Sequence, residues 1–298
     1  MKFCAVSVDL DEIDLYRDLH GLPRTGQPLA YRVALERAAA FARSEGVPLS
    51  VFAVGRDLQH EPNKRALREI AALGHEVENH SYEHRYDLTR QSPAEIQDDV
   101  RRAQETIGDI TGRRPRGFRA PGYTVSDALF EALEQQGLSF DSSVFPSPPY
   151  YLAKAAALAL KKRSVAVLDT PRVMAAPSQP YRPARPWYRP GGTGIVEMPI
   201  GVTPGLRLPF IGTALTLAGV GGARALARMC TILRFINLEL HAIDFLDVGD
   251  GLEDLAGLQP DVNIAVGTKQ RAIGAALDVL RAAGYRFVTL AQAAAHLS

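Results

Sequence analysis

The chain has 298 residues, with 34 Lys and Arg against 33 Asp and Glu and a net charge of +1. A hydrophobic share of 46% and a charged share of 22% are ordinary for a globular protein and exclude a disordered chain. Two cysteines cannot form a disulfide scaffold, which favours a reducing compartment. The short apolar run at 3–8 is followed directly by acidic residues, so no signal peptide is expected. The longest uncharged apolar stretch, 208–223, is too short for a membrane span, and we expect a cytoplasmic protein.

Strands and helices are expected to alternate along the chain. Periodicity and turn residues predict strands at 3–9, 49–55, 76–80, 117–119, 139–145, 195–200, 237–241 and 286–290. They predict helices at 34–44, 63–73, 92–108, 127–136, 270–283 and 291–297, with a capping box at Ser92 and Glu95 and an N-cap at Ser126. Such alternation indicates an α/β fold with parallel strands. We expect one barrel domain over 1–298 that includes a variable, insertion-like segment at about 146–236.

Charge is distributed unevenly along this domain. The segment 150–234 holds twelve basic residues and two acids, a net charge of +10. The rest of the chain holds 22 basic and 31 acidic residues and carries −9. A cationic, apolar segment in an acidic body points to an anionic partner, either a phosphate-bearing ligand or a membrane surface.

Polar residues suited to catalysis follow four of the predicted strands. They are Asp9 and Asp11, His80 and His84, the run Arg119-Ala-Pro-Gly-Tyr123, and His241. Catalytic groups of α/β barrels gather at such strand ends. Two histidines four residues apart, joined by a carboxylate from another loop, can hold zinc or a neighbouring first-row metal and leave positions open. The alternative is that His80 and His84 form a surface pair.

In this order the motifs D-x-D, H-S-x-x-H, R-x-P-G and a short form of L-x-H, Leu240-His241, resemble those of the polysaccharide deacetylase family, also called NodB-homology or carbohydrate esterase family 4. The resemblance covers residues 2 to 290, and the D-x-D form marks one branch of the family. It implies a distorted (β/α) barrel and metal-dependent removal of an N- or O-acyl group, most often acetyl, from a sugar.

The resemblance also implies a role for each matching residue. Asp11, His80 and His84 match the metal ligands, Asp9 the catalytic base, and Arg119 the arginine that holds this base. His241 matches the general acid, and Tyr123 falls where the family uses a backbone N–H as an oxyanion donor. The family's usual Asp-Trp motif, which tunes the acid histidine, is not evident here. Asp141 and Asp244 are both candidates to orient His241.

These assignments predict a metal-dependent N-deacetylase that acts on an amino sugar in a polysaccharide, a glycoconjugate or a lipid-linked form. Zinc is the expected metal, and cobalt, nickel and manganese suit the same ligands. Two alternatives stay open, namely a deformylase or amidase acting on another small amide and a non-catalytic carbohydrate-binding relative. His20, His60, His75 and His296 are expected to be surface or structural residues.

The cationic segment admits two interpretations. Residues 150–162 and 206–234 combine apolar runs with Lys and Arg, as in an element lying on anionic lipid at the inner face of the cytoplasmic membrane. The substrate would then be lipid- or phosphate-linked. The alternative is an ordinary pair of barrel helices with a solvated basic face. Aromatic residues of the segment suit either sugar stacking or loop packing; they are Tyr150, Tyr151, Tyr181, Trp187 and Tyr188. No nucleic-acid partner is expected.

Overall fold

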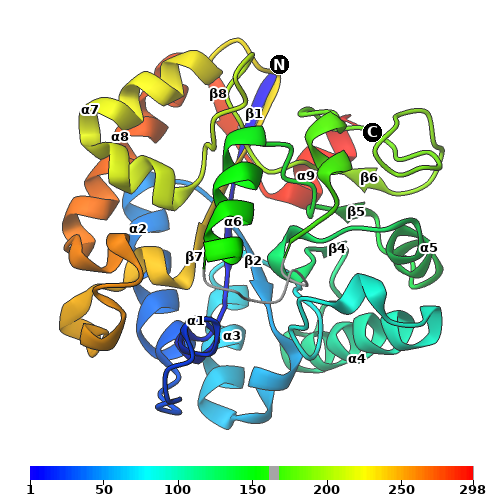
Figure 1. Cartoon of the computed structure of the whole chain (residues 1–298), viewed down its shortest axis with the longest axis horizontal. Helices are drawn as coiled ribbons and strands as arrows, with labels where there is room; N and C mark the ends of the chain where they lie inside the picture. The colour runs from blue at the N-terminus through cyan, green and yellow to red at the C-terminus, as the bar shows by residue number, and fades with distance from the viewer. Residues whose placement is uncertain (161–167, 298) are drawn as a thin grey trace.

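A curled, wholly parallel sheet surrounded by helices forms the centre of the computed structural model, which describes residues 1–160 and 168–297 (Figure 1). The strands follow the order β6-β5-β4-β3-β2-β1-β7, and β8 pairs with the first half of β1. Their bounds are β1 Lys2–Asp9, β2 Leu49–Ala53, β3 Glu76–Asn79, β4 Gly117–Phe118, β5 Phe140–Asp141, β6 Val196–Glu197, β7 Phe235–His241 and β8 Tyr285–Phe287. This architecture is the predicted distorted (β/α) barrel.

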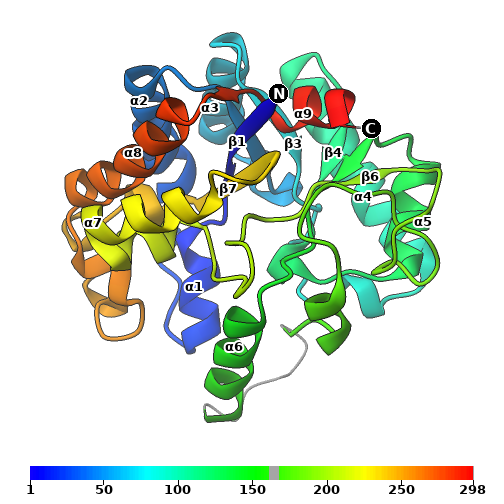
Figure 2. The same cartoon turned by 90° about the horizontal axis from the view of Figure 1, so that it is seen from above.

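Helices cover the outside of this sheet (Figure 2). Their bounds are α1 Ile13–His20, α2 Leu35–Glu45, α3 Glu61–Ala72, α4 Pro93–Thr111, α5 Asp127–Gln135, α6 Pro148–Leu160, α7 Gly212–Cys230, α8 Val266–Ala282 and α9 Leu290–Leu297. A π-helical turn at Ala30–Ala34 leads into α2. Among the described residues, no helix is both long enough and apolar enough to cross a bilayer.

Local sequence signals account for several of these boundaries. Ser92 and Glu95 form the predicted capping box of α4, and the Ser126 side chain accepts from the N–H of Leu129 at the start of α5. Gly46 ends α2 in the left-handed conformation that glycine adopts without strain. Strand β1 is buried from Phe3 to Asp9, as expected of a central parallel strand covered on both faces.

The barrel is open between β6 and β7, and a loop fills the opening. Gly201 N–H donates to Asn237 O at 2.8 Å, and Ile211 forms a parallel bridge with Glu239 of β7. A Cβ on Gly201 would lie 2.5 Å from Asn237 O, so this close backbone approach requires glycine. The loop therefore takes the place of a strand next to β7.

Two predicted strands are much shorter in the structure, and three helices, α1, α6 and α7, lie outside the predicted helix ranges. The strands expected at 139–145 and 195–200 reduce to the two-residue β5 and β6. Beyond β5 the chain leaves the ladder, and Ser142 Oγ instead accepts from Arg119 Nη2 at 2.8 Å. Helix α1 lies in a stretch expected to be a loop, and α7 bends at Gly219, where φ is 65°.

The cationic segment divides into α6, loops, β6 and α7. Of its basic residues, Lys161, Lys162 and Arg163 lie outside the described part of the chain. Helix α7 packs along α8 (Figure 1), with small residues such as Ala223 and Ala227 buried between them. Its Arg224 and Arg228 are exposed. This packing agrees with the interpretation of a barrel helix with a solvated basic face, and membrane contact stays a prediction.

Candidate active site

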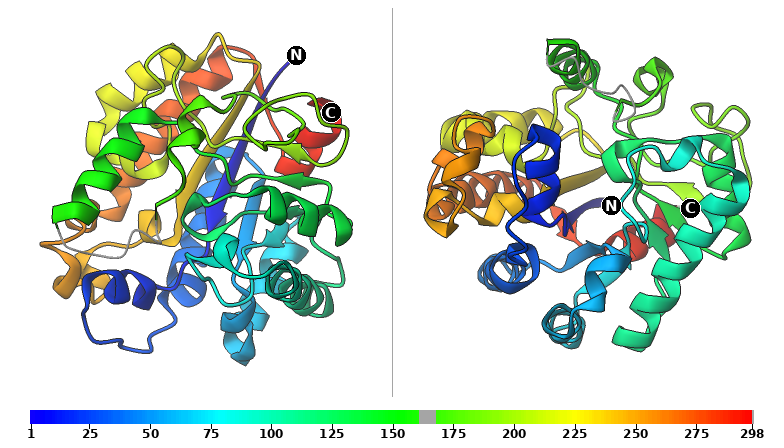
Figure 3. Two further views of the ribbon diagram at one scale, coloured as in Figure 1. Left: turned by 45° about the vertical axis from the view of Figure 1, so that its right-hand side comes forward. Right: turned by 60° about the horizontal axis from the view of Figure 1, so that its bottom comes forward.

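The four predicted motifs meet at the carboxyl ends of the central strands. Asp9 is the last residue of β1, His80 and Arg119 directly follow β3 and β4, and His241 ends β7. The register pairs Asp9 with His241 across neighbouring strands. The strands that carry these residues open toward the end of the barrel where α1 lies (Figure 3, right).

Asp11, His80 and His84 form a buried cluster whose three ligand atoms all lie within 4.8 Å of one another. Asp11 Oδ1 lies 3.2 Å from His80 Nε2 and 3.1 Å from His84 Nε2. Burial raises the pKa of Asp11, but the nearby His84 and His80 outweigh it and hold the pKa well below its usual range. The side chains therefore converge on one point, as the resemblance implies.

The donor set fits a divalent transition metal. His80 Nδ1 donates to the backbone carbonyl of Arg119 at 2.7 Å, which leaves Nε2 free to ligate. Both ring nitrogens of His84 are buried, and neither makes a well-aligned hydrogen bond, although Nε2 lies 3.1 Å from Asp11 Oδ1. Such an arrangement costs free energy unless something binds there. Two imidazoles and one carboxylate are ligands that zinc and its neighbours prefer.

A tight turn sets the positions of the two histidines. Asn79 Oδ1 accepts from the N–H of Ser81 at 2.8 Å, and Ser81 Oγ accepts from the N–H of His84 at 3.0 Å. Ser81 and His84 both have left-handed backbones, with φ of 66° and 52°. Asn79 is in turn anchored to Val100 O of α4 at 2.8 Å. This turn therefore brings the two rings of the H-S-x-x-H motif together. A regular helix would not present both rings in the same way.

Arg119 fixes Asp9 through a fully buried ion pair. Its Nη1 donates to Asp9 Oδ1 at 2.6 Å, its Nη2 donates to Ser7 Oγ and Ser142 Oγ, and its Nε donates to Ser142 O. The guanidinium also lies 4.2 Å from the centre of the Phe52 ring. Asp9 Oδ2 is left facing the site, 3.8 Å from His80 Nε2 and 4.0 Å from His241 Nε2.

Tyr123 enters the site through its side chain. Its N–H donates to Ala120 O at 3.0 Å, so the oxyanion role expected of this N–H stays a prediction. Its hydroxyl donates to Glu239 Oε1 at 2.7 Å and lies 3.1 Å from His241 Nε2. The left-handed backbone of Tyr123, with φ of 63°, turns the ring toward these residues.

Glu239 is the residue that orients His241, and it was not among the residues predicted from the sequence. Its Oε1 lies 3.0 Å from His241 Nδ1. Of the two predicted candidates, Asp244 accepts from the backbone N–H of His241 at 2.8 Å, while Asp141 binds Ser143 instead. Strand alternation was the available signal, because Glu239 and His241 are two residues apart on β7 and share a face.

The surroundings of His241 favour its charged form. Burial lowers its pKa, but the negative charges of Glu239 and Asp9 raise it to about 9. Atoms of Asp9, Glu239 and His241 also lie within 4.8 Å of one another. Because Arg119 already pairs with Asp9, this second group suits proton transfer beside the metal ligands.

A cavity of about 390 Å³ opens onto these groups. Tyr150 of α6 lines it, whereas Trp187 and Tyr181 are buried in the packing of the loop, with the Tyr181 hydroxyl donating to Trp187 O. Among the histidines expected to be structural, His75 accepts from the N–H of Leu49 and His296 stacks on Phe3.

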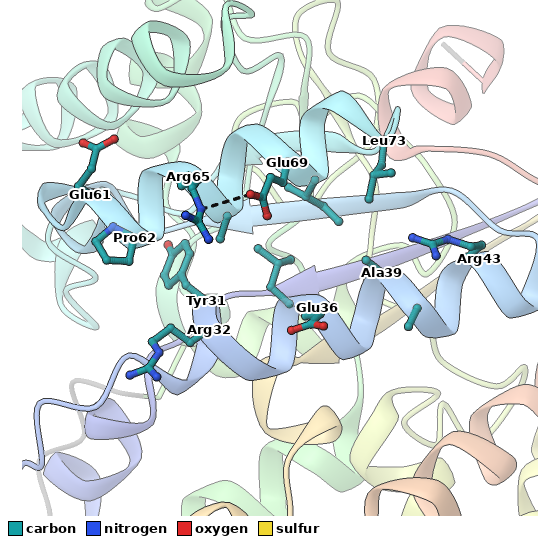
Figure 4. A pocket seen from close by; sticks show the side chains of 14 residues that line it. Tyr31, Arg32, Glu36, Ala39, Arg43, Glu61, Pro62, Arg65, Glu69 and Leu73 are labelled. Atoms are coloured by element: carbon teal, nitrogen blue, oxygen red, sulfur yellow. Dashed lines mark ion pairs between the residues drawn. The ribbon is translucent and has the colours of Figure 1, made fainter.

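A larger cavity of about 720 Å³ lies away from the site, in the groove between α2 and α3 (Figure 4). Arg65 and Glu69 of α3 form an exposed ion pair on its rim. None of the predicted catalytic or metal-binding residues lines this groove. Five of the predicted site residues line the smaller cavity instead, namely Asp9, Asp11, His80, Tyr123 and His241.

Comparisons with known proteins show similarity to deacetylases over part of the chain. Residues 30–140 match the sequence profile of the polysaccharide deacetylase family, a range that includes His80, His84, Arg119 and Tyr123. A peptidoglycan deacetylase from Helicobacter pylori is 28% identical over 125 residues, 41% of this chain and 42% of that protein. A chitooligosaccharide deacetylase from Bradyrhizobium is 38% identical over 85 residues, 28% of this chain and 37% of that protein. The match thus spans less than half the length of these relatives.

Solved structures support the same fold over nearly the whole chain. A candidate polysaccharide deacetylase from Mycobacterium smegmatis superposes with a TM-score of 0.62 at 19% identity, covering 99% of this chain and 90% of that one. A carbohydrate esterase family 4 pseudoenzyme from Bacillus anthracis superposes with a TM-score of 0.53 at 12% identity, covering 99% of this chain and 66% of that one. Together these comparisons show that residues 30–140 are similar to polysaccharide deacetylases and that nearly the whole chain shares their fold.

Proposed function

We propose that this chain is a metal-dependent hydrolase that removes an N-acyl group, most often acetyl, from an amino sugar. The observation that carries the proposal is the position of Asp9. One of its oxygens is fixed by Arg119, and the other faces the point on which Asp11, His80 and His84 converge. A base held beside a metal cluster is what activation of water for amide hydrolysis requires.

The three ligands would hold a divalent ion, with zinc the first choice and cobalt, nickel or manganese also suited. When bound, such an ion polarises the amide carbonyl and makes the attacking water more acidic. The His80 ring is held by the carbonyl of Arg119, the residue that also fixes Asp9. This shared contact keeps ligand and base in one rigid unit.

Proton transfer falls to Asp9 and His241. Asp9 Oδ2 takes a proton from the attacking water while the oxygen of that water forms a bond to the acyl carbon. His241, charged at neutral pH, gives a proton to the nitrogen of the amide as the C–N bond breaks. A carboxylic acid and a free amino sugar leave the site, and Glu239 and Tyr123 hold the imidazole in place throughout.

Acyl release from a panel of sugars tests this proposal. The metal-loaded protein is incubated with N-acetyl and N-formyl amino sugars, free, polymeric and lipid-linked, and released acetate or formate is measured. We expect release from at least one N-acetyl sugar and a loss of about 10²- to 10⁴-fold in Asp9→Asn. Release of formate alone would favour the deformylase alternative. A metal-loaded protein that cleaves none of them would overturn the proposal.

A lipid-linked substrate at the inner face of the cytoplasmic membrane is the finer form of this proposal. Leu217 of α7 lines the cavity and is 54% exposed, and Leu152 of α6 is 62% exposed. An exposed apolar side chain on the cavity lining, and another on the same cationic segment, suit an acyl chain and an anionic lipid surface. Flotation with anionic and neutral vesicles tests the contact, and equal recovery near zero with both would contradict it.

A further inference from the structure

One lysine stands out in the cavity that holds the proposed catalytic groups. Among the described residues lining that cavity, Lys154 is the single Lys or Arg. It comes from α6, within the variable segment, and Tyr150 lies one turn earlier on the same helix. Both side chains pack on Tyr123, with Lys154 Nζ 5.7 Å from the Tyr123 ring centre and the two tyrosine rings 6.1 Å apart.

The ammonium group of Lys154 has unused hydrogen-bonding capacity. It donates to Gly122 O at 3.2 Å, which uses one of its three N–H groups. No carboxylate in the described ranges 1–160 and 168–297 lies within 4.0 Å of it. Asp169, the acid that acts on it at longer range, lines a small cavity that also touches Lys154. A cation placed in a cavity without an ion-pair partner is most stable when a ligand brings the negative charge.

Lys154 also lies close to the reacting groups. The Tyr123 side chain contacts both Lys154 and His241, so one aromatic ring separates the ammonium from the proposed general acid. A sugar ring is of similar width. An anionic substituent on the sugar ring being deacylated, or joined directly to it, would therefore reach Lys154.

We propose that Lys154 is a specificity-determining residue that binds an anionic oxygen group, a phosphate or a carboxylate, carried by the amino sugar. This inference rests on the proposed function and names a substrate class for the same site. Burial lowers the pKa of Lys154 to about 8, although the negative charge of Asp169 acts to raise it. In most molecules the Lys154 side chain is therefore charged at pH 7. An anion that binds it gains a charge-assisted hydrogen bond, the stronger kind.

Paired substrates and matched variants test the proposal. Metal-loaded full-length protein is assayed with N-acetylglucosamine, its 1-phosphate, an alkyl phosphodiester of that 1-phosphate, and N-acetylglucosaminuronic acid. We expect kcat/KM at least tenfold higher for one anionic form than for the neutral sugar. The phosphate and carboxylate arms identify the source of the charge. Lys154→Met should lower kcat/KM for that form about 10- to 100-fold and change the neutral sugar less than threefold.

The remaining variants separate specificity from structure. Lys154→Arg keeps the charge and should retain much of the preference, and Lys64→Met, on α3, should behave like the wild type. An equal loss on neutral and anionic sugars in Lys154→Met, or no loss on either, would overturn the inference. If the wild type cleaves none of these sugars, calorimetric binding of N-acetylglucosamine 1-phosphate still decides it. Weaker binding to Lys154→Met supports the inference, and equal binding overturns it.

Discussion

Glu239 and His241 share one face of β7, and the Glu239 carboxylate lies 3.0 Å from Nδ1 of the His241 ring. The same carboxylate oxygen accepts the hydroxyl hydrogen of Tyr123. Glu239 is fully buried, so water does not compete for its contact with the imidazole ring. This contact leaves Nε2 of His241 directed toward Asp9 and the cavity, where a proton donor is needed.

Glu239→Gln should therefore weaken proton donation by His241. The negative charge of Glu239 helps to raise the pKa of His241 to about 9, so its removal lowers that pKa. The proton donor would then be lost at lower pH, and the alkaline fall in kcat should move toward neutrality. We expect kcat at pH 8 to fall about 10- to 100-fold, part of what general acid catalysis contributes. An unchanged pH–rate profile would contradict the role given to Glu239.

Arg119→Lys should reduce both stability and activity, although the charge is kept. Lysine has no planar fork and cannot reach Asp9, Ser7 and Ser142 at once. At least one buried polar group then loses its partner, which costs about 1–3 kcal/mol of unfolding free energy. Chemical denaturation measures the stability and acyl release measures the activity. A variant as stable and as active as the wild type would show that the buried fork is dispensable.

Metal binding should stabilise the fold through Asp11, His80 and His84. An ion that binds only the folded chain adds about 2.7 kcal/mol when its free concentration is 100 times Kd. Thermal unfolding of the wild type should therefore move to lower temperature when a chelator is added. His84→Asn should show little difference with and without chelator, while His60→Asn, at a surface-exposed histidine, should respond like the wild type. Equal shifts in all three proteins would contradict the ligand assignment.

Glu12→Gln should stabilise the metal-free protein, and more so as pH rises. Burial raises the pKa of Glu12 from 4.5 to about 8. The hydrogen bond from the Ala30 N–H lowers this pKa, and the negative charge of Asp57 raises it further. Above pH 4.5 the unfolded chain ionises this group while the folded chain keeps it protonated, so native stability falls between pH 4.5 and 8. Glutamine removes that penalty, on the order of 2 kcal/mol at pH 8 and little at pH 4.5. Denaturation at both pH values with chelator present checks this, and a pH-independent difference would contradict it.

Sequence patterns were sufficient to predict the barrel and the polar residues that meet at its strand ends. Polar residues at strand ends can be recognised from the chain because buried apolar runs stop there, as at Asp9 and His80. The contacts made across the barrel could not be recognised in this way. Besides contacting His241, Glu239 accepts the hydroxyl hydrogen of Tyr123, which is 116 residues away in the chain, and no local pattern pairs Glu239 with Tyr123.

Helix α7 and the short strands were difficult for a related reason. The glycines of α7 lower its helix propensity, and packing against α8 compensates for it. Strand β5 ends early because the carbonyl and hydroxyl of Ser142 bind Arg119 instead of continuing the ladder. Tertiary contacts decide both cases, and a single sequence does not display them.

The central claim is that Asp11, His80 and His84 hold one divalent ion beside Asp9. Anomalous diffraction at the zinc absorption edge, from crystals of the zinc-loaded protein, tests it most directly. The account predicts one strong peak about 2.0–2.2 Å from Nε2 of both histidines and from Oδ1 of Asp11, with Asp9 bound to Arg119. No peak at that point in zinc-saturated crystals, or imidazoles turned away from each other, would contradict it.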